Sequence, residues 1–252
     1  MKVIILAAGM GTRLGDLTKD LPKCMVQVGD RPLLQYQLDI LRQKELSIAL
    51  VGGYKSELLA EFEEETVLNE EYDCTNMLWS FYLAIRDLDE EVIISYGDII
   101  YSKSILEKLL LSDSSVSVIS DLDFMPYWKG RSEDPLADLE TFKTDSGNNI
   151  IELGGRPTSI DEVEGQYIGL VKINRETLSL IKEIVEVDKE VNGKPVRNAY
   201  FTDLLQELIS RQVNLQAVPV RGEWIEVDTP EDINCEVAQV RLNKIKEVNY
   251  EQ

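Results

Sequence analysis

Histidine is absent from the sequence, cysteine is rare and long apolar stretches are missing. The absence of histidine removes the commonest general base and the serine–histidine–aspartate triad, so many hydrolase mechanisms are excluded. The three cysteines, Cys24, Cys74 and Cys235, are odd in number and widely spaced. They give neither a disulfide framework nor a Cys-x-x-Cys metal motif, which favours a reducing, cytoplasmic setting. Apolar runs such as residues 3–8 fall far short of the roughly 20 residues that cross a bilayer, so we expect no membrane span.

Positive charge is scarce as well, because 26 lysines and arginines face 46 aspartates and glutamates, a formal net charge of −20 at pH 7. A field of this sign repels a polyphosphate backbone, so we do not expect the chain to bind nucleic acid. The 252 residues suffice for one large α/β domain and are too few for two independent enzymatic domains. We therefore expect a single domain over residues 1–252, and whether it forms a homo-oligomer stays open.

The first half of the sequence alternates strand-like and helix-periodic segments. Its strand-like segments are Lys2–Leu6, Ser47–Val51, Glu91–Tyr96 and Ser115–Ser120. Leucines at helical spacing, such as Leu34, Leu38 and Leu41, lie between the first two. This alternation predicts a doubly wound, mostly parallel α/β sheet of Rossmann-like type.

The second half changes character. Three further strand-like segments, Thr141–Lys143, Asn149–Leu153 and Gln166–Ile173, follow one another without an intervening helical pattern. They predict a mixed or antiparallel, β-rich extension. Later segments predict two helices, a strand and the start of a last helix, at Glu176–Val187, Phe201–Arg211, Trp224–Val227 and Pro230.

A glycine-rich loop follows the first predicted strand, where residues 6–15 read LAAGMGTRLG. Such a loop can direct backbone N–H groups at phosphates, and Arg13 would add charge-assisted contacts. A Walker P-loop is excluded because the Gly-Lys-Ser/Thr ending is missing. The dinucleotide fingerprint fits poorly, since the third glycine comes one residue late and Pro22 interrupts the helix that should follow. A simple strand-exit turn stays open as an alternative.

Two aspartates, Asp98 and Asp228, each follow the end of a predicted strand. Open α/β sheets bind ligands at the carboxyl ends of their strands, so the two acids could meet there. Mg²⁺ commonly uses one or two carboxylates together with substrate phosphates, which makes Asp98 and Asp228 candidate metal ligands. Helix capping is the alternative for Asp228, which precedes Thr-Pro-Glu. Strand alternation directs Glu226 beside Asp228, so Glu226 ranks second as a ligand.

Candidate base contacts lie at the ends of two other segments. Gly53 and Tyr54 close the second strand, where glycine would let a ring approach the backbone. Thr75 and Asn76 can cap a helix that includes Ser80. The apolar residues of that helix have the spacing of core residues, so only the three polar ones are predicted contacts.

The loop at residues 6–14 together with Leu-Pro-Lys at residues 21–23 resembles the signature of nucleotide-sugar pyrophosphorylase-like nucleotidyltransferases. The resemblance implies that Lys23 neutralises charge around the α-phosphate and the acceptor phosphate, that Arg13 assists it, and that Asp98 and Asp228 bind Mg²⁺. The implied nucleotide contacts within the loop are Leu6, Ala7, Ala8, Gly9, Gly11, Thr12 and Arg13. The missing histidine fits, because an anionic acceptor oxygen needs no general base.

Five further segments, residues 75–80, 95–98, 134–138, 151–154 and 166–170, resemble cytidylyltransferases that activate phosphocholine, phosphonates or phosphoglutamine. The resemblance implies a CTP donor, a small phosphorylated acceptor, pyrophosphate release, and a role in capsule or cell-surface polysaccharide synthesis. It also implies a nucleotide-binding half at residues 1–120 and an acceptor-binding half at residues 121–252. Besides Lys23, the acceptor candidates are Lys129 and Arg131 in a loop-like stretch, Glu152 and Gln166.

Three alternatives stay open at this point. A sugar-1-phosphate nucleotidyltransferase performs the same chemistry, although residues 75–80 depart from the glycine-rich, alanine-containing segment that its members often carry. A non-catalytic nucleotide-binding module would keep the phosphate loop without transfer. A dinucleotide-dependent oxidoreductase is disfavoured by the fingerprint mismatch.

Overall fold

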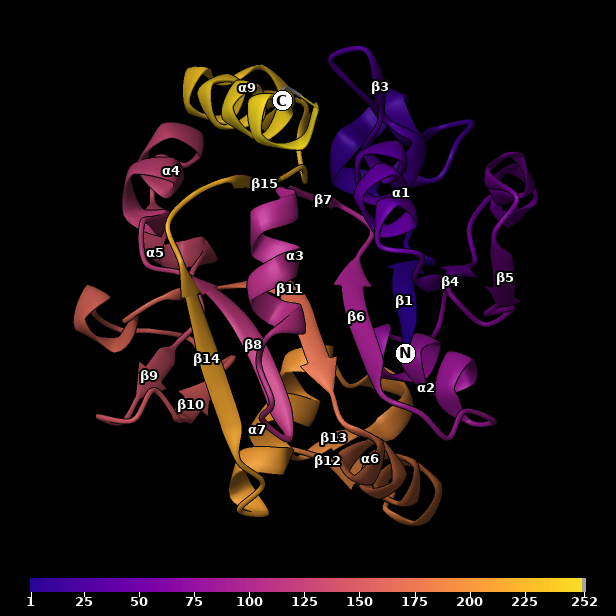
Figure 1. The fold of residues 1–252 in the computed structure, drawn as a ribbon, viewed down its shortest axis with the longest axis vertical. Coiled ribbons are helices and arrows are strands. Elements are labelled where there is room, and N and C mark those ends of the chain that lie inside the picture. Colours follow the sequence, from indigo (N-terminus) through magenta and orange to yellow (C-terminus); the bar gives the residue numbers. More distant parts are fainter. Residues whose placement is uncertain (251–252) are drawn as a thin grey trace.

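A seven-stranded sheet forms the centre of the computed structural model, which describes residues 1–250 (Figure 1). The strands in spatial order are β14 (Leu215–Val220), β8 (Val116–Asp121), β11 (Gln166–Ile173), β6 (Val92–Tyr96), β1 (Lys2–Ala7), β4 (Ser47–Gly52) and β5 (Glu65–Leu68). All run parallel except β11, which is antiparallel to both β6 and β8. The predicted doubly wound, mostly parallel sheet is confirmed. Of the predicted antiparallel extension, residues 142–153 pair outside this sheet, whereas residues 166–173 lie inside it as β11.

Helices cover both faces of this sheet. On one face the core includes α1 (Leu33–Gln43), α3 (Lys103–Leu110), α4 (Phe124–Arg131) and α9 (Glu236–Tyr250). On the other it includes α2 (Met77–Ile85), α6 (Arg175–Val187) and α7 (Phe201–Ser210). Strand β1 shows why: Val3 and Ile5 pack into the first core, and Ile4 and Leu6 into the second. A strand buried on both faces is apolar throughout, which explains the unbroken run that begins the sequence.

Four two-stranded pairings lie outside the central sheet. They are β2 (Gln27–Val28) with β3 (Arg31–Pro32), β7 (Ile99–Tyr101) with β15 (Trp224–Glu226), β9 (Phe142–Thr144) with β10 (Ile150–Leu153), and β12 (Glu190–Val191) with β13 (Lys194–Pro195). The β7–β15 pair matters most for the site, because β7 directly follows β6 and its carboxyl-terminal Gly97-Asp98 turn. The N–H of Val227 donates to the carbonyl of Asp98 at 3.0 Å, which brings the C-terminal segment to this edge of the sheet.

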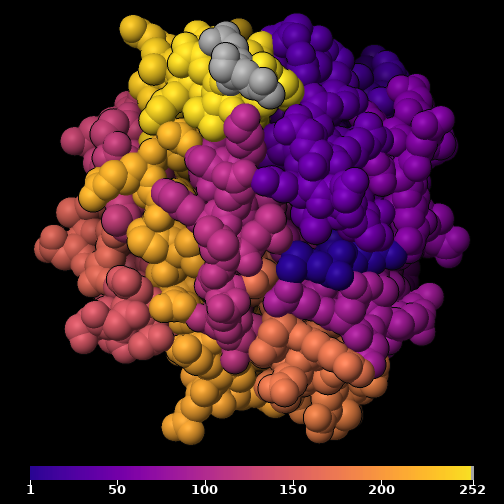
Figure 2. Space-filling model, viewed as in Figure 1, coloured from indigo at the N-terminus to yellow at the C-terminus, as the bar shows by residue number. Residues whose placement is uncertain are grey.

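Two further α-helices are short, α5 (Pro135–Asp138) and α8 (Pro230–Asn234). Five 3-10 helices in the described part of the chain lie in the connections, namely Thr12–Thr18, Lys23–Met25, Ser56–Phe62, Ile160–Glu162 and Val196–Asn198. Pro230 occupies the first turn of α8 as expected. Figure 2 shows α9 (yellow) beside the indigo-to-violet surface of an early part of the chain. Lys246 of α9 lies 2.7 Å from the carboxylate of Asp30, and Tyr250 donates to Asp39 at 2.9 Å. Helix α9 is therefore tied to the segment that carries Asp30 and Asp39.

Several expectations need correction. The loop-like stretch around Lys129 is the last part of helix α4, because Tyr127 and Trp128 are buried against Trp224. Some strands had no predicted counterpart, namely β2, β3, β5, β7, β12, β13 and β14. β14 carries Pro219, which is tolerated because β14 is an edge strand. Within residues 1–250 no helix is both long enough and apolar enough to cross a membrane.

Candidate active site

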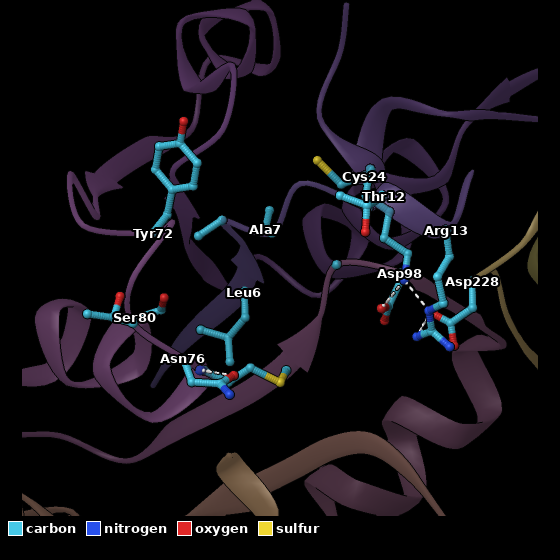
Figure 3. A pocket seen from close by; sticks show the side chains of 17 residues that line it. Leu6, Ala7, Thr12, Arg13, Cys24, Tyr72, Asn76, Ser80, Asp98 and Asp228 are labelled. Carbon is cyan, nitrogen blue, oxygen red and sulfur yellow. Dashed lines mark hydrogen bonds and ion pairs between the residues drawn. The ribbon is translucent and has the colours of Figure 1, made fainter. Parts of the chain in front are cut away.

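A cavity of about 300 Å³ opens at the carboxyl ends of β1 and β6 (Figure 3). Its lining includes the loop residues predicted to bind the nucleotide, namely Leu6, Ala7, Ala8, Gly9, Gly11, Thr12 and Arg13. Gly11 has a left-handed backbone with φ of 62°, and a β-carbon there would lie 2.9 Å from the β-carbon of Lys23. The hydroxyl of Thr18 donates to the Gly11 carbonyl at 2.9 Å and ties the loop down. Glycine at position 11 therefore serves both the turn and the close approach of Lys23.

Lys23 joins the two predicted metal-binding aspartates. Its Nζ lies 2.6 Å from Oδ2 of Asp98 and 2.5 Å from Oδ1 of Asp228, and Arg13 lies 2.9 Å from the same Asp228 oxygen. Burial opposes the charged form of Lys23, but the charges of Asp98 and Asp228 outweigh it and raise the pKa of Lys23 above its ordinary value. The structure thus brings all four residues predicted to be catalytic into one charged cluster.

The buried guanidinium of Arg131 lies beside Asp228. Arg131, whose side chain is 4% exposed, lies 2.8 Å from Asp232, 3.3 Å from Glu226 and 3.7 Å from Asp228. Asp232 also accepts bonds from the backbone N–H groups of Asp228 and Thr229 at 2.9 and 2.8 Å. Sequence reasoning predicted Arg131 as an acceptor ligand, but its donors point into this carboxylate group.

The acids of this group do not share their protons equally. Burial and the charge of Asp228 raise the pKa of Glu226 well above its ordinary value. Burial alone would also raise the pKa of Asp228, but a hydrogen bond with Glu226 and the charge of Lys23 lower it instead. The lowered pKa favours the ionised form of Asp228 and the raised pKa favours the protonated form of Glu226, so Asp228 suits a cation better than Glu226 does.

The aspartate pair fits a divalent cation that also binds substrate. Oδ1 of Asp98 is buried and has no hydrogen-bond partner among residues 1–250. In the same part of the chain, no group of three or more His, Cys, Asp or Glu side chains is arranged to hold a metal ion. Mg²⁺ keeps waters and substrate phosphate oxygens as ligands, so two carboxylates suffice for it.

The opposite end of the cavity is polar and uncharged. Figure 3 shows Tyr72, Asn76 and Ser80 on the side away from Arg13, Asp98 and Asp228. A buried residue that sequence reasoning missed, Asn69, donates to the hydroxyls of Thr75 and Ser80 at 3.0 and 2.9 Å. Asn76 caps α2 by accepting from the N–H of Met77. The three predicted polar contacts, Thr75, Asn76 and Ser80, all line the cavity.

Gly53 and Tyr54 lie elsewhere. A β-carbon on Gly53 would lie 2.6 Å from the β-carbon of Tyr72 and 2.8 Å from the carbonyl of Ala8. The glycine is therefore needed for packing against Tyr72, which lines the cavity and was not predicted. Tyr54 donates to the carbonyl of Lys19, on the far side of the glycine-rich loop.

A second cavity of about 200 Å³ shares part of its wall with the first. Arg13, Met77 and Asp228 line both. The second cavity also contains Gln166, as predicted, and Glu140, which sequence reasoning missed. Two cavities that meet at a cationic and acidic cluster can hold two substrates with their reacting ends together.

Lys129 and Glu152 line neither cavity. Lys129 is exposed on α4, and Glu152 pairs with Lys143 at 2.8 Å on the β9–β10 hairpin.

Lys129→Ala and Glu152→Gln are each expected to leave the catalytic rate and the acceptor KM within about twofold of the unchanged protein, as is usual for exposed side chains. Steady-state kinetics would check this. A tenfold rise in acceptor KM for either variant would show that the residue contributes to acceptor binding.

The fold and the charged cluster agree with the class of nucleotidyltransferases, and comparison with known proteins shows that class and the family. The family of MobA-like NTP transferase domains matches residues 3–151, and the chain belongs to this family of nucleotidyltransferase enzymes. The CTP:phosphoglutamine cytidylyltransferase of Campylobacter jejuni is 36% identical over 252 residues, covering 94% of this chain and 99% of that protein. The choline-phosphate cytidylyltransferase of Streptococcus pneumoniae is 36% identical over 106 residues, 40% of this chain and 46% of that protein.

Among solved structures, the inositol-1-phosphate CTP transferase from T. maritima superposes with a TM-score of 0.76. It is 20% identical, and the match covers 98% of this chain and 97% of that one. At this identity the match shows the fold, which is that of nucleotide-diphospho-sugar transferases.

Proposed function

We propose that this chain transfers CMP from CTP to a small phosphorylated acceptor and releases pyrophosphate. The observation that carries the proposal is the wall common to the two cavities, where Arg13 and Asp228 stand beside Lys23 and Asp98. One cavity follows the glycine-rich loop and would hold the nucleotide; the other would hold the acceptor.

In the proposed reaction an anionic oxygen of the acceptor forms a bond to the α-phosphorus of CTP. The bond between that phosphorus and the oxygen bridging to the β-phosphate breaks, and its electron pair leaves with pyrophosphate. No proton has to be removed from the attacking oxygen, which agrees with a chain that has no histidine. Cys24 lines the nucleotide cavity, but burial raises the pKa of its thiol to about 12, so it does not act as a nucleophile. In this mechanism the acceptor attacks CTP directly.

The cations of the cluster provide charge neutralisation. On substrate binding, Lys23 and Arg13 would exchange some of their contacts with Asp98 and Asp228 for contacts with phosphate oxygens. The glycine-rich loop would donate backbone N–H groups to the triphosphate. Asp98 and Asp228 would hold Mg²⁺, which when bound screens the charge on the phosphates.

The donor and acceptor are proposed from the relatives. CTP is favoured as the donor because the two curated relatives and the solved structure are all named for cytidylyl transfer or CTP. The relative that matches nearly the whole chain is named for phosphoglutamine. We therefore place the acceptor in the class of phosphoglutamine, phosphocholine or phosphonates rather than sugar 1-phosphates.

Pyrophosphate release with Mg²⁺ would test the proposal, with each of the four ribonucleoside triphosphates against sugar 1-phosphates, phosphocholine, aminoethylphosphonate and phosphorylated glutamine. We expect release with CTP and a non-sugar acceptor, reduced at least about 100-fold by Asp98→Asn. Asp87→Asn, which changes an aspartate whose side chain is 92% exposed, serves as the matched control. Pyrophosphate release that requires a sugar 1-phosphate would make the chain a sugar-1-phosphate nucleotidyltransferase. No pyrophosphate release with any pair of substrates would contradict the proposal.

A further inference from the structure

Four carboxylates line the second cavity against one guanidinium. The carboxylates belong to Asp138, Glu140, Glu226 and Asp228, and the guanidinium to Arg13. Glu226 and Asp228 are already compensated, because both lie within 4 Å of Arg131 and Asp228 also contacts Lys23. Asp138 and Glu140 form no ion pair with any other residue in the range 1–250. The carboxylates of Asp138 and Glu140 are therefore the uncompensated acids of this cavity.

Glu140 is the more buried of the two acids. Burial and the nearby charge of Asp203 raise the pKa of Glu140 to about 7, and Lys194 only partly offsets them. An ionised carboxylate is thus disfavoured in the empty cavity, and a ligand cation beside it would remove the disadvantage.

The rest of the wall suits a cation that carries N–H groups. Aromatic rings contribute much of the lining, from Tyr96, Trp128, Tyr167 and Tyr200. Such rings attract cations through their faces. Gln166 donates its Nε2 to the carbonyl of Tyr167, and its Oε1 is buried without a partner among the described residues. An N–H donor on a ligand is the kind of group that this oxygen lacks.

We propose that the second cavity binds the end of the acceptor remote from its phosphate, and that Glu140 selects acceptors in which this end carries a primary ammonium group. The assignment rests on the proposed function, since it takes the second cavity as the acceptor site. A primary ammonium offers both the charge that Asp138 and Glu140 need and the N–H groups that Gln166 needs. A trimethylammonium group offers only the charge, and a sugar offers only hydroxyl donors.

Three probes separate these features: 2-aminoethyl phosphate, propyl phosphate, which has a methyl in place of the ammonium, and phosphocholine. Binding to the full chain without nucleotide would be measured by NMR titration, and kcat/KM by pyrophosphate release from CTP. We expect 2-aminoethyl phosphate to be preferred over propyl phosphate by about 10- to 100-fold, the usual range for a hydrogen bond between charged groups. Phosphocholine should fall between the two.

Glu140→Gln should reduce the preference for the amine to within about threefold, because the isosteric amide keeps the shape and removes the charge. Asp138→Asn should reduce it less, since Asp138 is exposed at the rim. Glu183→Gln, an exposed acid on α6, should leave it unchanged. Thermal unfolding of each variant would report whether it is folded.

The outcomes separate this assignment from the proposed function. Equal binding of the amine and the methyl probe, a preference that survives Glu140→Gln, tighter binding of phosphocholine, or no binding of any probe would each overturn the assignment. A preference for the amine in binding without pyrophosphate release from CTP would support it and count against cytidylyl transfer.

Discussion

Replacing Lys23 by methionine is expected to slow pyrophosphate release about 100- to 1,000-fold, the cost of removing one preorganised electrostatic contact to a developing charge. Lys23 is the one cation that contacts both Asp98 and Asp228 among residues 1–250, with distances of 2.6 and 2.5 Å. Methionine keeps most of the length of the side chain, as an unbranched chain, and removes the ammonium. Single-turnover measurements with saturating CTP would isolate the transfer step from binding.

The matched control is Lys19→Met, which changes an exposed lysine shortly before Lys23 and should stay within about twofold. A Lys23→Met protein with an unchanged single-turnover rate would show that Lys23 only organises the empty site. A raised KM with normal kcat would instead assign Lys23 to substrate binding alone.

Replacing Arg131 by methionine is expected to lower the free energy of unfolding by about 3–5 kcal/mol, the typical cost of removing one partner from a buried ion group. Asp232 is 2% exposed and would lose its only guanidinium contact in the described part of the chain, as would Glu226, which is 25% exposed, so the cost falls mainly on Asp232. Denaturant unfolding at neutral pH would measure the change.

Lys129→Met on the same helix is the control, since Lys129 is exposed and should change stability by at most about 0.5 kcal/mol. The comparison also decides between the two roles considered for Arg131. If Arg131 binds the acceptor phosphate, its replacement would raise the acceptor KM without changing the free energy of unfolding. If it is a buried counter-ion, its replacement would lower the free energy of unfolding. An Arg131→Met protein as stable as the control would contradict the role that we derive from the structure.

The fold was predictable from local patterns, namely apolar strands that alternate with helix-periodic segments. The apolar strand and the glycine-rich loop that follows it indicated a phosphate site, whereas the role of Lys23 followed from the resemblance to a known family. Asp98 and Asp228 each follow a strand, and strands of this kind of sheet end at one edge. The partner strands that bring the two acids together were less predictable, since β7 has three residues and was not recognised.

Residues whose roles depend on distant packing escaped prediction. Arg131 has the sequence context of a surface cation, and only the fold shows that it meets the end of β15 and the start of α8. Gly53 was predicted to let a nucleotide ring approach the backbone, but the space beside it is filled by Tyr72 of the same chain. Glu140 lies in neither a helix nor a strand, so no sequence periodicity indicated that its side chain lines a cavity.

The wall common to the two cavities has a kinetic consequence under the proposed function. Once the new phosphorus–oxygen bond has formed, one molecule fills both cavities where two separate molecules had been bound. Its second half is then held at the high effective concentration of a linked ligand, so it dissociates more slowly than either substrate. The product would compete with CTP and with the acceptor alike, and its departure, rather than the chemical step, would set the pace of turnover and restrain the enzyme when product accumulates.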